Sequence, residues 1–111
     1  MQDIKNILKK ISKLKILVVG DIMLDEYIWG DIKRISQEAT IPIISVNSKS
    51  YNIGGAGNVA SNLVGLGAKV SIAGIIGQDH ESEIIYNIFK KQNIDYSMVF
   101  SLPKRQTTLK S

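Results

Sequence analysis

Three features of the chain have the residue types needed to bind a hydroxyl-rich small molecule. The stretch YNIGGAGNVASNLVGLG, residues 51–67, places Gly54 and Gly55 at the start of a predicted helix, where the first backbone N–H groups have no partner within the helix. Asn58 follows one turn later, and its amide both donates and accepts hydrogen bonds. Asp25 follows the end of an apolar strand, which is the edge where open α/β sheets bind ligands. A carboxylate, an amide and free N–H groups at one sheet edge suit a polyol.

Other interpretations of these residues exist. The glycines would also let the helix pack closely on its neighbours, and Asp25 would also serve to cap a turn. Gly55, Gly57 and Ala60 satisfy the dinucleotide-binding pattern G-x-G-x-x-[GA]. Asp79 lies near the distance at which a ribose-binding acid is expected. The order of the elements favours the polyol. In a dinucleotide-binding unit the first strand leads into the glycines, whereas the predicted strand at residues 15–21 leads into DIMLD.

The elements that must position these residues alternate between strands and helices. Continuous β-branched runs predict core strands over residues 15–21, 68–77 and 95–100, the first of them buried on both faces. Apolar residues at helical spacing predict helices over residues 3–14, from the glycines to a stop at Gly65 and Gly67, and from an N-cap at Asp79 to about Gln92. This order indicates an α/β layered fold with right-handed crossovers.

Residues 26–49 have a different pattern. EYIWGDI and IPIISVNSK are short, partly alternating β segments around the polar stretch KRISQEAT. Because their apolar positions would cover only one face, we expect a small antiparallel flap. The core then comprises residues 15–25 and 51–111.

Composition narrows the class of protein. The 111 residues suffice for one small domain, and the absence of cysteine leaves neither disulfides nor thiolate metal sites and fits a cytoplasmic setting. The net charge of +4 comes from scattered lysines, so no nucleic-acid partner is expected. No apolar run approaches the length of a membrane span, so no membrane partner is expected either.

The end of the chain, LPKRQTTLKS, enters the beginning of another predicted strand. Three core strands, with helices that would cover only part of them, make an incomplete layered domain. We therefore expect these residues to be a fragment of a longer domain.

The stretch GGAGNVASNLVGLGAKVSIAGIIG resembles the first signature of the ribokinase-like (PfkB) carbohydrate kinases. The paired glycines, Asn58, Ala60, Gly67 and Gly77 stand at the spacings of that family. GDIMLDEY resembles the strand and aspartate with which these kinases begin, and GQD is similar to their Gly-x-Asp turn.

Within the family, GDIMLDEYIWGDIKRISQEATIPI is most similar to the heptose 7-phosphate kinases. Gln37 and Thr40 replace two prolines of that subgroup, which loosens the turn of the flap but touches no expected ligand.

The resemblance implies a ribokinase-like fold, with a mostly parallel sheet flanked by helices and a small antiparallel β lid over residues 26–49. It implies transfer of the ATP γ-phosphoryl group, with Mg²⁺, to a sugar hydroxyl. In the heptose subgroup this hydroxyl is O1 of D-glycero-β-D-manno-heptose 7-phosphate, and the product serves lipopolysaccharide core synthesis. A kinase for another sugar of the same family is the alternative.

Site residues carry over position by position. The resemblance implies that Asp25, Gly54, Gly55 and Asn58 line the sugar pocket. For Arg34 it implies a phosphate contact, with a salt bridge on the lid surface as an equal alternative. Lys110 is likewise a candidate phosphate contact.

The resemblance also implies that the lid closes to exclude water and forms a homodimer contact. The family's catalytic base lies in a Gly-Ala-Gly-Asp motif, which this sequence lacks. That base and the ATP site belong to the C-terminal half. We therefore expect no catalytic residue, no metal ligand, no strong ATP binding and no kinase activity in these 111 residues alone.

Overall fold

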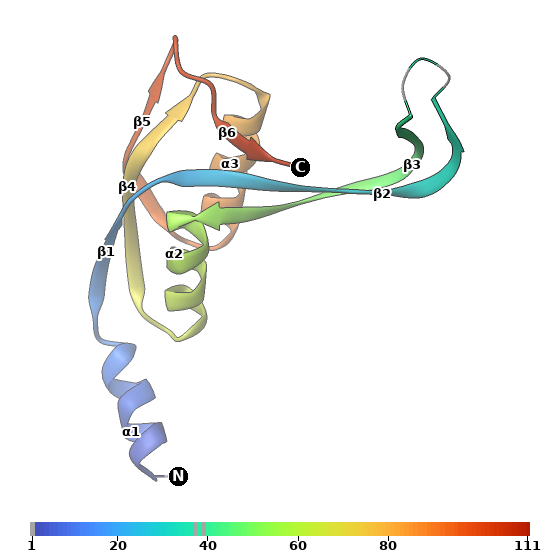
Figure 1. Ribbon diagram of the computed structural model, residues 1–111. Coiled ribbons are helices and arrows are strands. Elements are labelled where there is room, and N and C mark those ends of the chain that lie inside the picture. The colour runs from blue at the N-terminus through green and yellow to red at the C-terminus, as the bar shows by residue number, and fades with distance from the viewer. Residues whose placement is uncertain (1, 37, 39) are drawn as a thin grey trace.

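The computed structural model describes residues 2–36, 38 and 40–111. Its first sheet has three parallel strands in the order β1-β4-β5: β1 (Lys15–Val19), β4 (Lys69–Gly77) and β5 (Asp95–Leu102). The crossover helices α2 (Ala56–Gly65) and α3 (His80–Lys91) lie on one face of this sheet, as Figure 1 shows. The predicted α/β fold is confirmed.

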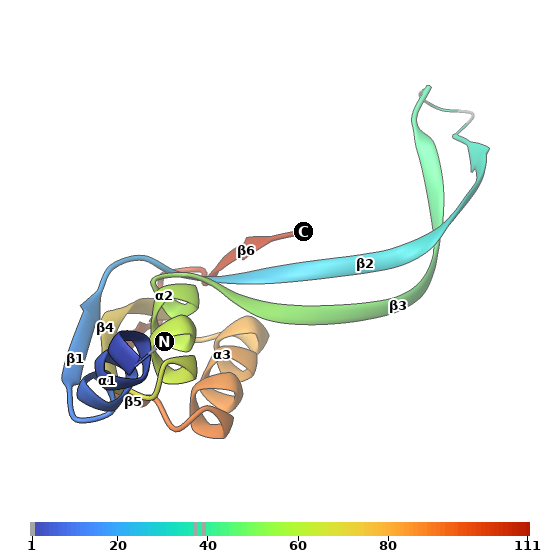
Figure 2. The same ribbon diagram turned by 90° about the horizontal axis from the view of Figure 1, so that it is seen from below.

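The second sheet has the order β3-β2-β6 and contains a long antiparallel hairpin. β2 (Ile22–Ile35) and β3 (Pro42–Gly55) are 14 residues each, and β6 (Thr108–Lys110) runs parallel to the first part of β2. The hairpin projects far from the core and bends along its length (Figure 2). Two bulges interrupt its pairing, between Trp29 and Gly30 and between Ile32 and Arg34.

The hairpin is longer than the flap expected over residues 26–49. Pairing runs from Ile22 opposite Gly55 to Ile35 opposite Pro42, so Asp25 belongs to the base of the hairpin and not to the first sheet. The reason is that β1 ends at Val19 and the chain turns before Ile22. The expected effect of Gln37 on the turn lies outside the described residues.

The core lies between the first sheet and its two helices, and the bases of β2 and β3 close it. Phe89 on α3 is fully buried there, with its ring centroid 6.3 Å from that of Tyr96 on β5. The remaining buried apolar residues are Ile22, Leu24, Ile53, Ala60, Ala68, Val70, Ile72, Ile76, Ile85, Ile94 and Val99.

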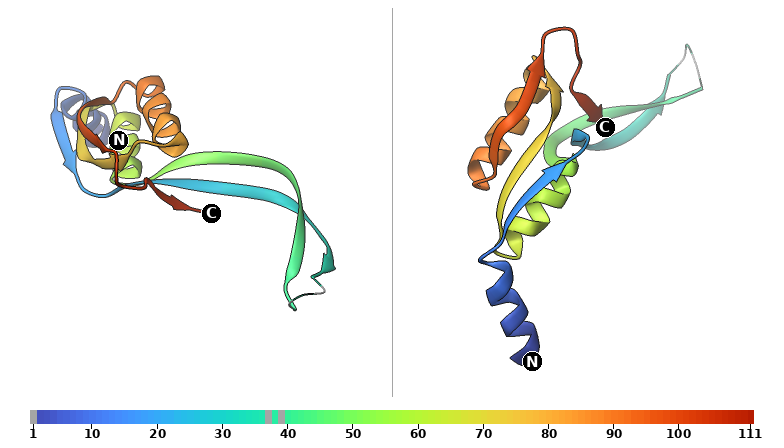
Figure 3. Two further views of the ribbon diagram at one scale, coloured as in Figure 1. Left: turned by 90° about the horizontal axis from the view of Figure 1, so that it is seen from above. Right: turned by 90° about the vertical axis from the view of Figure 1, so that its left-hand side faces the viewer.

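The opposite face of the first sheet is uncovered, and Figure 3 (right) views this face with both helices behind it. Val19 is 72% exposed and Phe100 is 64% exposed. The expectation that β1 is buried on both faces is therefore wrong, because helices cover only one side of the sheet. Ile16 and Val18 alternate with the exposed Leu17 and Val19.

Helix α1 (Gln2–Ile11) projects beyond the first sheet and has no buried residue. It ends three residues before the predicted end at residue 14. The Ser12 hydroxyl donates to the Lys9 carbonyl, which is a local bond that competes with continuation of the helix. Within residues 2–36, 38 and 40–111, no helix has the length and apolar character required to cross a membrane.

The two phenylalanines provide a matched test of where the core lies. We expect Phe89→Ala to lower the free energy of unfolding by about 3–5 kcal/mol, because it leaves a cavity in a closed core. Phe100→Ala removes the same ring from the uncovered face and should cost about 1 kcal/mol or less. Urea unfolding followed by circular dichroism measures both. Equal losses would contradict this placement of the core.

Candidate functional site

The predicted site residue Asp25 lies in the middle of a row of three polar residues across the second sheet. It is the register partner of Asn52 on β3 and of Lys110 on β6. Register partners share one face of a sheet on strands about 4.8 Å apart. The fold therefore brings together a carboxylate, an amide and an ammonium group.

Gly54 lies on the same face as Asp25, because its register partner Met23 is two residues from Asp25. A Cβ atom at Gly54 would lie 3.0 Å from each carboxylate oxygen of Asp25. The carboxylate thus lies directly over the backbone of Gly54. This close approach explains the glycine without appeal to a ligand, and it also fixes where the carboxylate points.

Gly55 joins β3 to α2 and is the N-cap residue of that helix. Its φ is 59°, and a Cβ atom there would overlap the carbonyl oxygen of Asp21. That carbonyl accepts a 2.7 Å hydrogen bond from the Ala56 amide. Because glycine has no side chain, no side-chain cap satisfies the N–H groups that follow Ala56 in the first turn. Asn58, in the same turn, is exposed.

The structure thus brings together five of the six predicted residues, Asp25, Gly54, Gly55, Asn58 and Lys110, at the junction of β2, β3, β6 and α2. Arg34 is not among them. It pairs with Ile43 near the far end of the hairpin, nine residues along β2 from Asp25 or about 30 Å at the rise of an extended strand. Asn52 was missed in the sequence, because only the hairpin register shows that it faces Asp25.

The dinucleotide interpretation is not supported by this geometry. A Cβ atom at Gly57 would overlap the side chain of Ile53, and both Gly57 and Ala60 are buried. These small residues therefore let α2 pack on β3. The carboxylate of Asp79 already accepts hydrogen bonds from the Ser82 amide and from Thr107. The strand that leads into the glycines is an antiparallel member of the second sheet.

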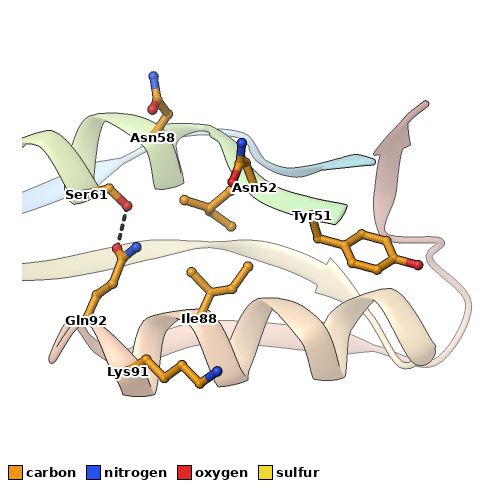
Figure 4. A pocket seen from close by; sticks show the side chains of 8 residues that line it. Tyr51, Asn52, Asn58, Ser61, Ile88, Lys91 and Gln92 are labelled. Atoms are coloured by element: carbon orange, nitrogen blue, oxygen red, sulfur yellow. Dashed lines mark hydrogen bonds between the residues drawn. The ribbon is translucent and has the colours of Figure 1, made fainter. Parts of the chain in front are cut away.

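A cavity of about 320 Å³ lies between α2, α3 and the base of β3 (Figure 4). The Ser61 hydroxyl donates to the side-chain carbonyl of Gln92 across it. The amide of Asn58 points away from Gln92 in this view. Asn52 and Asn58 line this cavity and also belong to the junction, so the cavity borders the junction where Asp25 lies.

Glu26, next to Asp25, faces the other side of the sheet with its register partner Tyr51. The Ser111 hydroxyl donates to Glu26 over 2.8 Å, and this bond, aided by Tyr51 and Lys49, holds the pKa of Glu26 below its usual range. The contact with Glu26 in turn raises the pKa of the Tyr51 hydroxyl. The Ser111 bond joins the end of β6 to β2.

The residues described do not form a metal site of their own. No group of three His, Asp or Glu side chains in the described part of the chain could hold a metal ion. The Asp25 carboxylate over Gly54 would repel a polyphosphate at the glycine turn. The junction suits a neutral, hydroxyl-rich group beside a single anionic group.

Residues 13–111 match the model of the pfkB family carbohydrate kinases, and the chain belongs to this family. It is 41% identical over 110 residues to the bifunctional protein HldE of Geobacter metallireducens. This alignment covers 99% of this chain and 22% of that relative. It is 47% identical over 97 residues to the HldE protein of Helicobacter pylori, covering 87% of this chain and 21% of that relative. The chain thus spans about a fifth of the length of these relatives.

The fold is similar to solved sugar kinases. A carbohydrate kinase from Agrobacterium tumefaciens superposes with a TM-score of 0.65 and 26% identity, covering 84% of this chain and 29% of that one. Fructokinase from Xylella fastidiosa gives a TM-score of 0.64 at 20% identity, covering 86% and 27%. The ribokinase-like fold predicted from the sequence is confirmed.

Two glycines test the contact between Gly54 and Asp25. We expect Gly54→Ala to lower the free energy of unfolding by about 1–3 kcal/mol, because Asp25 and Met23 must move aside. Gly65→Ala is the control, since nothing lies within 4 Å of its Cβ position in α2. It should raise stability by up to about 1 kcal/mol, because alanine favours the helix. Thermal unfolding of both variants measures this, and a neutral Gly54→Ala would contradict the contact.

Proposed function

We propose that this chain is the sugar-binding part of an ATP-dependent kinase that phosphorylates O1 of D-glycero-β-D-manno-heptose 7-phosphate in the cytoplasm. The observation that carries the proposal is the junction itself, where Asp25 lies between Asn52 and Lys110 beside the uncapped start of α2. The family and the HldE relatives support a sugar kinase of this kind.

The residues of the junction bind and orient the sugar. The two oxygens of Asp25 accept hydrogen bonds from neighbouring hydroxyls, while Asn58 and the N–H groups after Gly54 contact others. Holding the sugar in one orientation lowers the entropic cost of the reaction. The β2–β3 hairpin, which projects from the core here, closes over the bound sugar as a lid and excludes water, which is the competing acceptor.

In the complete enzyme, ATP and Mg²⁺ supply the phosphoryl group and neutralise its charge. We propose that the groups that bind them and the catalytic base lie outside these residues, because the donor set described here does not fit a polyphosphate. The role of this chain is then to present the acceptor hydroxyl.

A kinase for an unphosphorylated sugar is the second candidate. The distance between Arg34 and Asp25 along β2 favours it, because Arg34 cannot contact a phosphate on the sugar held by Asp25 of the same chain. Lys110 beside Asp25 favours a phosphorylated sugar. Comparison of the two ligands decides between these candidates.

We expect titration calorimetry to show binding of heptose 7-phosphate, and Asp25→Asn to weaken it at least tenfold by removing the charged acceptor. Asp95→Asn is the control, because Asp95 is exposed and accepts a hydrogen bond from Ser97 on β5, away from the junction. A coupled ADP-release assay should show no turnover by these residues alone. Binding of NADH in place of the sugar would contradict the proposal.

We also propose that the lid mediates a homodimer. Trp29, Ile32 and Ile35 on β2 are each about 60% exposed, and Ile44 and Val46 on β3 are each about half exposed. Ile32 and Ile44 are register partners, so their side chains form one apolar patch on a hairpin that projects into solvent. A second copy of the hairpin would bury these side chains.

Light scattering after size exclusion tests the dimer. We expect the double variant Ile32→Ser, Ile44→Ser to shift the mass from dimer to monomer, because it removes two large apolar side chains from the same face of the hairpin. Leu66→Ser, at an exposed position next to α2, should leave the mass unchanged. A dimer that survives the double variant would place the interface elsewhere.

A further inference from the structure

A partly buried group of hydrogen bonds joins the end of β4 to the start of β6. The Asp79 carboxylate accepts from the Thr107 amide over 2.8 Å and from the Thr107 hydroxyl over 2.7 Å. The same hydroxyl accepts from the Gly77 amide over 2.9 Å. Thr107 is only 6% exposed. We call these three residues, with Ser82, the Asp79–Thr107 clamp.

The clamp is closely packed. A Cβ atom at Gly77 would overlap the Arg105 carbonyl oxygen and lie 2.8 Å from the Thr107 amide nitrogen, so only glycine allows this approach. Asp79 also caps α3 in a capping box with Ser82. Burial raises the pKa of Asp79, but the hydrogen bonds from Thr107 and Ser82 outweigh it and leave the pKa below its usual range. The hydrogen bonds of the clamp therefore favour the charged carboxylate of Asp79.

Strand β6 has little else to hold it. It is three residues long, all of them exposed, and its ladder partner is β2 alone. A strand this short contributes few ladder bonds, so it needs an anchor at its start. Thr107 immediately precedes Thr108, the first residue of β6, and the Ser111 bond to Glu26 follows its last residue.

We infer that the Asp79–Thr107 clamp is a positioning device for Lys110, which binds the anionic group of a phosphorylated sugar held by Asp25. By fixing the start of β6, the clamp sets the register that places Leu109 opposite Leu24 and Lys110 opposite Asp25. Thr107 and Asp79 act through Lys110 and do not touch the ligand. This inference rests on the proposed function and specifies its substrate class.

The chemistry of Asp25 and Lys110 explains why one binds hydroxyls and the other binds the anionic group. A carboxylate only accepts hydrogen bonds, so Asp25 binds hydroxyls and repels phosphate. A lysine ammonium only donates and is a flexible point charge that suits phosphate. With the two on neighbouring strands, one ligand can satisfy both only if it carries hydroxyls close to an anionic group.

The clamp is tested first without ligand, by hydrogen exchange in this chain. We expect Thr107→Val to speed exchange of the amides of residues 108–110 at least tenfold, and of the Gly77 amide, which loses its acceptor, with a smaller effect on the other β4 amides. Thr107→Ser keeps the hydroxyl and should restore protection. Thr108→Val is the matched control, since it makes the same change at the adjacent, exposed position. Unchanged exchange in Thr107→Val would overturn the inference.

Binding by calorimetry then tests whether the clamp acts through Lys110. We expect Thr107→Val and Lys110→Met each to weaken heptose 7-phosphate binding about tenfold and to leave binding of the unphosphorylated heptose unchanged. If both act through one ammonium, the double variant should be no weaker than Lys110→Met alone. Losses that multiply, or that are equal for both sugars, would overturn the inference.

The two measurements separate the inference from the proposed function. If the unaltered chain binds neither sugar, the proposed function and the role of Lys110 both fail, while the exchange data still decide whether the clamp anchors β6. If the chain binds the unphosphorylated sugar equally well, the sugar site stands and the role of Lys110 is overturned.

Discussion

The junction of the two sheets is held by a hydrogen bond from the Ala56 amide to the Asp21 carbonyl. Asp21 is where the chain leaves the first sheet, and Ala56 is where it leaves the hairpin and begins α2. The bond is possible because Gly55 adopts a positive φ and has no Cβ to meet that carbonyl. It fixes the start of β2 beside the end of β3, and the pairing of Ile22 with Gly55 sets the register of the hairpin. Asp25, Asn52 and Gly54 then face one another as a consequence.

Much of the fold follows from local patterns in the sequence. Asp79 was predicted as the N-cap of α3, and the capping box confirms it. The strand expected over residues 68–77 is β4, and the strand expected at the end of the chain is β6. Burial was harder to predict. A continuous apolar run such as that of β1 shows that a strand belongs to a sheet, but it does not show whether elements of the same chain cover both faces.

The candidate site was partly predictable. Asp25, Gly54, Gly55 and Asn58 stood out by residue type and by their places at element ends, and the fold brings them together. Asn52 required the hairpin register, which depends on two long strands that the sequence showed only as short segments. The exclusion of Arg34 required the length of those strands, since a long extended hairpin separates residues that a compact flap would bring close. Local patterns therefore identified the groups, and long-range pairing decided which of them meet.

Helix α1 has an unusual thermodynamic status, because none of its residues is buried. A helix of ten residues has marginal stability in water when nothing packs against it, since the cost of nucleation is spread over few hydrogen bonds. Ile4, Ile7 and Leu8 give α1 one apolar side, and lysines occupy another. Its ordering and the burial of that side are thus coupled into a single equilibrium. The helical content of residues 2–11 becomes a reporter of whether that side has found a partner, while Ile11 at the end of α1 packs against the core.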